Sequence, residues 1–143
     1  MVNEYESNLE NLIRSMRLDL DAPDLLVVIG ELGMHGPVPT GRGTDRVMAM
    51  RAAEQAVTES DEFKDSTAFV STSQYVVDNE TTYNGKCHYY CRADTFCHIG
   101  KAFGRAMWNL INQQTSKASG SETIREMNDE TAKSPLSRIL AKP

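Results

Sequence analysis

The spacing of apolar residues along the chain predicts three helices that alternate with two strands. Apolar side chains recur every three to four residues over residues 3–20, over a second stretch beginning near Val47, and from Ala93 to about Ile111, as in amphipathic helices. Between them, LLVVIG (Leu25–Gly30) and TAFVST (Thr67–Thr72) are short runs typical of strands buried in a sheet. The order helix, strand, helix, strand, helix predicts an α/β fold with one right-handed β-α-β crossover and a parallel strand pair.

Glycine, proline and polar residues mark the connections and the end of the chain. Residues 31–44 hold four glycines and two prolines, which favours a loop leaving the first strand. Gly100 and Gly104, one turn apart, are expected to let the last helix approach the sheet closely. We therefore expect residues 1–113 to form the α/β portion and residues 114–143 a polar, flexible tail with at most a short helix near residues 121–128.

Two parallel strands would make an unusually narrow sheet. Parallel strands normally belong to wider sheets that are covered on both faces. The pattern therefore predicts the C-terminal part of a larger domain, or a chain that pairs its open strand edge with a partner.

Composition and charge exclude several classes of partner. The net charge of −5 and the isoelectric point near 5.2 argue against a nucleic-acid-binding protein. No apolar run approaches the roughly 20 residues that cross a bilayer, and the first ten residues lack the pattern of a secretory signal. Three cysteines leave at least one thiol outside any intrachain disulfide, so a reducing compartment is the simpler expectation.

Cysteines and histidines concentrate in residues 83–107, which raises the question of a metal site. The pair Cys87 and Cys91 has a spacing that zinc sites use, whereas the adjacent Cys97 and His98 would point in different directions on a helix. The pattern does not favour a metal site. We expect His98 to face solvent and Cys97 to be a small packing residue. No glycine-rich phosphate loop follows either strand, so no cofactor is expected.

His88 differs from His98 because it lies on the loop that leaves the second strand. Glu31 and His35 lie on the corresponding loop after the first strand. The carboxyl ends of parallel strands meet at one edge of a sheet, which is where open α/β sheets carry their chemistry. The pattern brings Glu31, His35 and His88 to one edge, where a histidine could move a proton and a carboxylate could fix its tautomer. From this pattern alone, an exposed, non-catalytic loop histidine is the more common interpretation.

Several segments together resemble a known family. They are EYESNLENLIRSMRLDLDAPDLLVVIGELG, then RAAEQAV, TAFVST and GKCHYYCRADTFCHIGKAFGRAM. In order and spacing they resemble the C-terminal half of the sialate O-acetylesterase-like carbohydrate esterases of the SGNH hydrolase superfamily, over roughly residues 3–111. The resemblance implies a partial three-layer α/β/α, flavodoxin-like fold. It also implies hydrolysis of acetyl esters on carbohydrates by a serine nucleophile, with His88 as the general base.

The sequence departs from the family pattern in two ways. Gly85 stands where an Asp commonly precedes the histidine, so a carboxylate orienting His88 would come from Glu31, Asp78 or Glu80. Glu31 is the favoured candidate because its loop neighbours that of His88, and loop hydrogen bonding is the alternative interpretation of Glu31.

The second departure concerns the nucleophile. The blocks that carry the family's serine, its oxyanion-hole Gly and Asn and its Gln-Gly-Glu segment have no counterpart here, and Ser7, Ser71 and Ser73 do not lie in a nucleophile elbow. The chain alone is therefore expected to be inactive. Two functions stay open: the base-bearing segment of a carbohydrate O-acetylesterase, or a non-catalytic module that binds carbohydrate or protein.

Overall fold

The computed structural model describes residues 2–33, 35–76, 89 and 92–132, and only the backbone of residues 2–3 and 119–132. The elements in chain order are α1 (Val2–Asp19), β1 (Val27–Gly30), α2 (Thr44–Glu59), β2 (Thr67–Val70), the 3-10 turn η1 (Ser73–Tyr75) and α3 (Ala93–Ala132). The predicted order of helices and strands and the α/β class are confirmed. Each strand is shorter than its apolar run, because Leu25 donates back to the Ala22 carbonyl in a turn and Thr72 leaves the ladder to bond Glu31.

β1 and β2 form a parallel pair in the register Val27 with Thr67 through Gly30 with Val70. The backbone ladder runs one step past each end of the pair, since Val27 N donates to Ser66 O at 3.0 Å and Glu31 N to Val70 O at 2.9 Å. Residues that follow the two strands therefore meet at one edge of the sheet. The candidate site lies at this edge.

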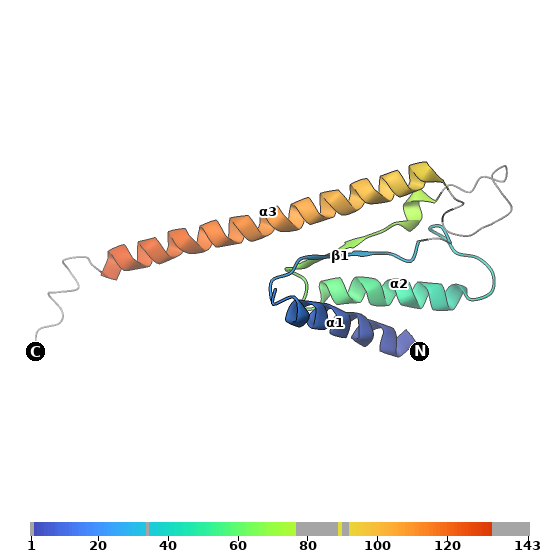
Figure 1. Ribbon diagram of the computed structural model, residues 1–143, viewed down its shortest axis with the longest axis horizontal. Coiled ribbons are helices and arrows are strands. Elements are labelled where there is room, and N and C mark those ends of the chain that lie inside the picture. The colour runs from blue at the N-terminus through green and yellow to red at the C-terminus, as the bar shows by residue number, and fades with distance from the viewer. Residues whose placement is uncertain (1, 34, 77–88, 90–91, 133–143) are drawn as a thin grey trace, which may run out of the picture. The chain divides into compact units, whose positions relative to one another are not determined.

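α1 and α2 cover one face of the strand pair (Figure 1). The core between these layers consists of Ile13, Ile29, Val57 and Phe63, of which Val57 and Phe63 have no exposed surface. Burial of each such side chain contributes about 2 kcal/mol, so this cluster is a main source of the unit's stability.

The beginning of α3 covers the other face, which gives a partial three-layer α/β/α arrangement (Figure 1). Phe103 lies against Gly30 so closely that a methyl group at Gly30 would come within 2.4 Å of its ring. The prediction that Gly100 and Gly104 provide the close approach was wrong, because both face open space. The close approach of α3 therefore depends on Gly30 in the strand, and Phe103 of the helix fills the space beside it.

The last helix begins at Ala93 as predicted but continues to Ala132, so the prediction that it ends near Ile111 was wrong. Residues 112–132 contain no proline, and many of them are good helix formers. The chain divides into two units, Met1–Leu110 and Ile111–Pro143. The flexibility of residues 114–143 stays a prediction.

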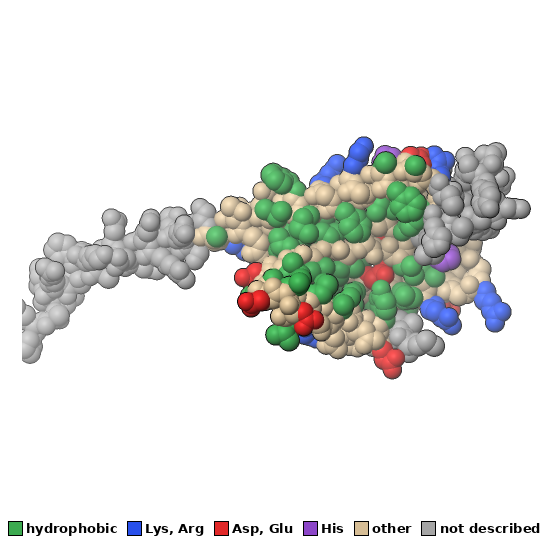
Figure 2. Space-filling view, viewed as in Figure 1, with side chains coloured by type: hydrophobic (Ala, Val, Ile, Leu, Met, Phe, Trp, Pro, Cys, Tyr) green, Lys and Arg blue, Asp and Glu red, His purple; other side chains and the backbone are tan. Residues whose placement is uncertain are grey.

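The first unit exposes large apolar side chains on its outer helices. Leu12 and Leu18 of α1 are 54 % and 80 % exposed, and Trp108 of α3 is 63 % exposed. Figure 2 shows hydrophobic side chains gathered on the face between α3 and α1. Within the described residues, each strand also has one edge without a neighbouring strand. In that same part of the chain, no helix has the length and apolar character needed to span a bilayer.

Candidate functional site

Glu31 is the centre of a hydrogen-bonded cluster at the carboxyl ends of both strands. Its Oε2 accepts the Ser71 hydroxyl at 2.7 Å and the Ser73 backbone N–H at 3.0 Å. Its Oε1 lies 3.3 Å from the Nε of Arg51 on α2, and the two side chains are only 9 % and 6 % exposed. One carboxylate thus joins the loop after β1, the loop after β2 and helix α2.

This environment keeps Glu31 ionised. Burial acts to raise its pKa, but the hydrogen bonds from Ser71 and Ser73 and the positive charge of Arg51 outweigh that effect and lower the pKa below its ordinary value. Glu31 is therefore a buried anion and a poor base. It can hold a positive charge or accept a hydrogen bond, but it is not suited to removing a proton from a hydroxyl group.

Arg51 and Glu54, one turn apart on α2, hold the loop that follows β1. Arg51 donates to the carbonyls of Leu32 at 2.9 Å and Gly36 at 2.8 Å, while Glu54 accepts the Leu32 N–H at 2.8 Å and the Tyr5 hydroxyl at 3.1 Å. Burial raises the pKa of Glu54, although the bonds from Leu32 and Tyr5 oppose this. The two carboxylates beside Arg51 therefore have pKa values shifted in opposite directions.

Thr72 connects the two loops and also reaches the segment before α3. Its hydroxyl donates to the Glu31 carbonyl at 2.7 Å and lies 2.9 Å from the Tyr89 hydroxyl. A threonine hydroxyl has one proton, so Tyr89 must be the donor in the second bond. Gly33 is required here, because a methyl group at this position would come within 2.1 Å of the Thr72 hydroxyl oxygen.

The segment that carries His88 leaves and rejoins the described structure at this edge. Before it, the Tyr75 carbonyl accepts the hydroxyl of Thr95, a residue at the start of α3 that is only 1 % exposed. After it, Tyr89 has a left-handed backbone with φ of 59° and bonds Thr72. His88, Asp78 and Glu80 lie outside the described residues, so the catalytic role of His88 stays a prediction.

Ser7, Ser71 and Ser73, which the sequence does not place in a nucleophile elbow, have no strong base beside them among the described residues. The Ser71 hydroxyl donates a hydrogen bond to Glu31, and the lowered pKa of Glu31 makes this carboxylate a weak base. Ser73 is buried and bonds Glu31 through its backbone, and the Ser7 hydroxyl caps the Glu4 carbonyl. That the chain lacks the nucleophile stays a prediction.

The other predicted residues are more exposed. His35 is exposed on the loop after β1, and His98 is exposed with its ring stacked on Tyr75, the centroids 5.8 Å apart. Exposure of His98 is confirmed, whereas the packing role predicted for Cys97 was wrong because this residue is an exposed free thiol. Among the described residues, no group of three or more His, Cys, Asp or Glu side chains is placed to hold a metal ion; Cys87 and Cys91 lie outside them.

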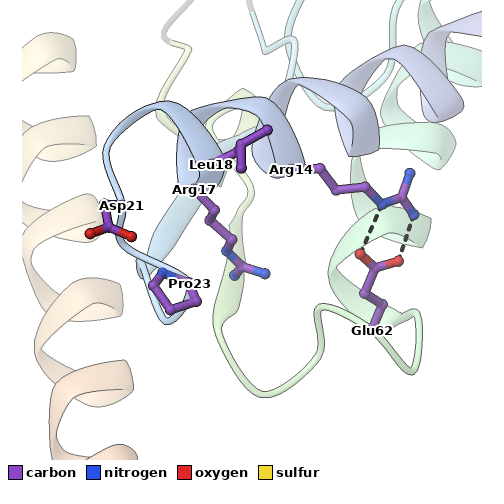
Figure 3. Close-up of a pocket in the computed structure, with 6 residues that line it drawn as sticks. All are labelled: Arg14, Arg17, Leu18, Asp21, Pro23 and Glu62. Atoms are coloured by element: carbon purple, nitrogen blue, oxygen red, sulfur yellow. Dashed lines mark hydrogen bonds and ion pairs between the residues drawn. The ribbon is translucent and has the colours of Figure 1, made fainter.

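A cavity of about 370 Å³ lies at the opposite ends of the strands (Figure 3). Arg14 and Glu62 form an ion pair on one side of it, and Arg17 donates to the Leu25 carbonyl at 3.1 Å and the Ser66 hydroxyl at 2.7 Å. Its charged groups thus serve to join α1 to the residues that precede each strand. A second cavity, of about 240 Å³, lies beside His35 at the start of α2.

The sequence pattern did not identify Arg51, Glu54 or Tyr89 as residues of the site. Arg51 and Glu54 carried a usable signal, because two charged residues three positions apart fall on the buried face of an otherwise alanine-rich helix. Their partners lie 15 to 49 positions away in the chain, however, and no local pattern identifies them.

Comparison of the chain with protein-family models, with curated proteins and with solved structures finds no match.

Proposed function

We propose that this chain is the C-terminal segment of a serine-type carbohydrate O-acetylesterase and that His88 is its general base. The observation that carries the proposal is the attachment of the His88 segment at both of its ends. Thr95 bonds the Tyr75 carbonyl, and Tyr89, the residue after His88, bonds Thr72 beside Glu31. A histidine on such a segment would stand at the carboxyl edge of the sheet, where α/β enzymes carry their chemistry.

In this proposal, Glu31 orients His88. Ser71 and Ser73 use the acceptor positions of Oε2, while Oε1 has Arg51 as its partner and retains capacity for one more hydrogen bond. An ionised carboxylate on the second ring nitrogen would fix the tautomer in which the other nitrogen accepts the serine proton. The lowered pKa of Glu31 supports this role, because an orienting carboxylate acts in its charged form.

The nucleophile and the oxyanion hole would be supplied by a further part of the same α/β domain. The open strand edges and the exposed Leu12, Leu18 and Trp108 support this, because a wider sheet and its covering helices would bury such surfaces. The substrate would be an acetylated carbohydrate, and the products acetate and the free sugar hydroxyl.

The test is to join this chain to the upstream, serine-bearing portion of an SGNH carbohydrate esterase and to measure acetate release from acetylated xylan. We expect activity in the joined protein and none in the isolated chain. His88→Ala should lower kcat/KM of the joined protein by about 100-fold or more, the usual contribution of a general base. His98→Ala, which removes an exposed imidazole from α3, is the matched control and should leave kcat/KM unchanged.

Two results would contradict the proposal. One is a joined protein that folds but releases no acetate, and the other is an equal loss of activity in the two histidine variants.

The second candidate is a non-catalytic module that binds carbohydrate or a protein through the same edge. It is favoured by the exposed apolar residues and by the involvement of Ser71 in a structural bond to Glu31. If the second candidate function is right, a ligand binds the isolated chain and His88→Ala leaves that binding intact.

A further inference from the structure

The cavity of about 240 Å³ beside the start of α2 has a basic lining. Its polar lining residues are His35, Thr40, Arg42, Thr44 and Arg46, and no acidic side chain lines it. We propose that this cavity binds an oxyanion, the carboxylate, phosphate or sulfate group of a small ligand. The assignment rests on Arg42, Arg46 and His35 and does not depend on esterase activity.

Arg42 and Arg46 are used differently from the arginines that build the fold. Arg14 bonds Glu62 and Arg51 bonds Glu31 and two carbonyls, whereas within the described residues neither Arg42 nor Arg46 has a side-chain hydrogen bond or ion pair. Asp45 stands between them in the chain but does not line the cavity, so a bound anion would supply the counter-charge there. The planar donor fork of arginine fits the oxygen pairs of carboxylate and phosphate groups.

Hydrogen bonds support the loop that carries His35 and Arg42, while Arg46 lies in the first turn of α2. Arg51 bonds the Gly36 carbonyl, and the Thr44 hydroxyl bonds the Gly41 carbonyl at 2.8 Å. Gly41 and Gly43 have left-handed φ angles of 92° and 93°, which orient the chain on both sides of Arg42. His35, Arg42 and Arg46 are exposed, but the backbone that carries them is supported, which lowers the part of the entropy cost that comes from ordering the loop.

The position and size of the cavity limit its ligand. The loop leaves the carboxyl end of β1, the usual position of ligands on open α/β sheets. The volume is below the roughly 300 Å³ at which pockets for drug-sized molecules begin. A free oxyanion or one charged substituent of a larger molecule fits this volume.

The test measures the binding of small anions to the full chain at low ionic strength. Calorimetry and the NMR signals of the arginine Nε–H groups detect the binding. Inorganic phosphate and glucuronate are the two probes, and glucose is the uncharged control ligand. We expect saturable binding of phosphate that weakens as salt is added. Binding of glucuronate but not of glucose would identify the charged substituent of a sugar as a ligand, and binding of phosphate alone would identify a free ion.

Variants separate this site from general electrostatic attraction. Arg42→Gln and Arg46→Gln should each weaken binding by about tenfold, the effect of removing one charge-assisted hydrogen bond. Arg105→Gln makes the same charge change on the exposed face of α3 and should leave affinity unchanged. Folding of each variant is checked by circular dichroism. The proposal is overturned if neither probe binds saturably, if the double variant at 42 and 46 binds like the wild type, or if Arg105→Gln weakens binding equally.

Discussion

Gly33 is the residue whose substitution tests the candidate site most directly. It lies on the loop after β1, against the loop after β2. In Gly33→Ala the added carbon would stand 2.1 Å from the Thr72 hydroxyl oxygen, 2.6 Å from Ser73 N and 2.8 Å from the Thr72 carbonyl carbon. The hydroxyl can rotate away, but the two backbone atoms cannot. The two loops must therefore move apart.

The size of the effect follows from these distances. Restoring a contact of about 3.5 Å requires a shift of about 1 Å between the loops. The bonds from Thr72 to the Glu31 carbonyl and from Ser73 N to the Glu31 carboxylate are 2.7 and 3.0 Å long and would both exceed normal length. Losing them costs about 1 kcal/mol each, and overpacking adds about 1 to 3 kcal/mol. We expect the free energy of unfolding to fall by about 3 to 5 kcal/mol, which lowers Tm by about 12 °C or more.

Urea unfolding followed by near-ultraviolet circular dichroism measures this change. Gly100→Ala is the matched control, because the same methyl group there has no neighbour within 4 Å. The control should raise the free energy of unfolding by about 0.5 to 1 kcal/mol through helix propensity. A Gly33→Ala protein within about 0.5 kcal/mol of the wild type would refute the close packing of the two loops on which the site depends.

Three further predictions concern the sheet and its surroundings. Gly104→Ala should raise the free energy of unfolding by about 0.5 to 1 kcal/mol, as measured by urea titration. A lower free energy of unfolding would mean that this face of α3 packs against other residues. Gly30→Val should lower it by about 3 kcal/mol because the side chain would meet the Phe103 ring, and a neutral result would contradict the packing of α3 on the strands. Glu31→Gln should lower it by about 3 kcal/mol at pH 7, since Arg51 loses its buried counter-charge. Because the folded pKa of Glu31 is lowered, its contribution is present above its unfolded pKa and is lost as pH falls through the folded pKa. The wild type and Glu31→Gln should therefore converge in acid, and a constant difference between pH 7 and pH 3 would contradict the assignment.

The order of elements could be predicted because it depends on local patterns. The helical spacing of α1 and the continuous apolar runs of β1 and β2 each lie within one segment and need no knowledge of partners. The convergence of Glu31 with the loop after β2 also followed, because parallel strands bring their carboxyl ends together. The loop hydrogen bonding considered for Glu31 is present, and its second role toward His88 stays a prediction.

The details of packing could not be predicted in the same way. Helical periodicity identified an apolar stripe on α3 but could not say that Gly100 would face open space while Gly30 met Phe103. That outcome depends on the distance between layers, which side chains from several segments determine together. The end of α3 was missed because the apolar stripe ends at Leu110 while helix-forming residues continue beyond it.

The strand pair is fastened at both of its ends, although each strand has only four residues. Before the strands, one nitrogen of Arg17 bonds the Leu25 carbonyl and the Ser66 hydroxyl; after them, Thr72 bonds the Glu31 carbonyl. A short ladder held only by its own hydrogen bonds could slip along its axis, and a slip of one residue would turn every side chain to the opposite face. The hydrogen bonds at both ends oppose that slip. The alignment of Glu31 with Ser71 therefore depends in part on an arginine that bonds Ser66, five residues before Ser71 and so about 16 Å away along the strand.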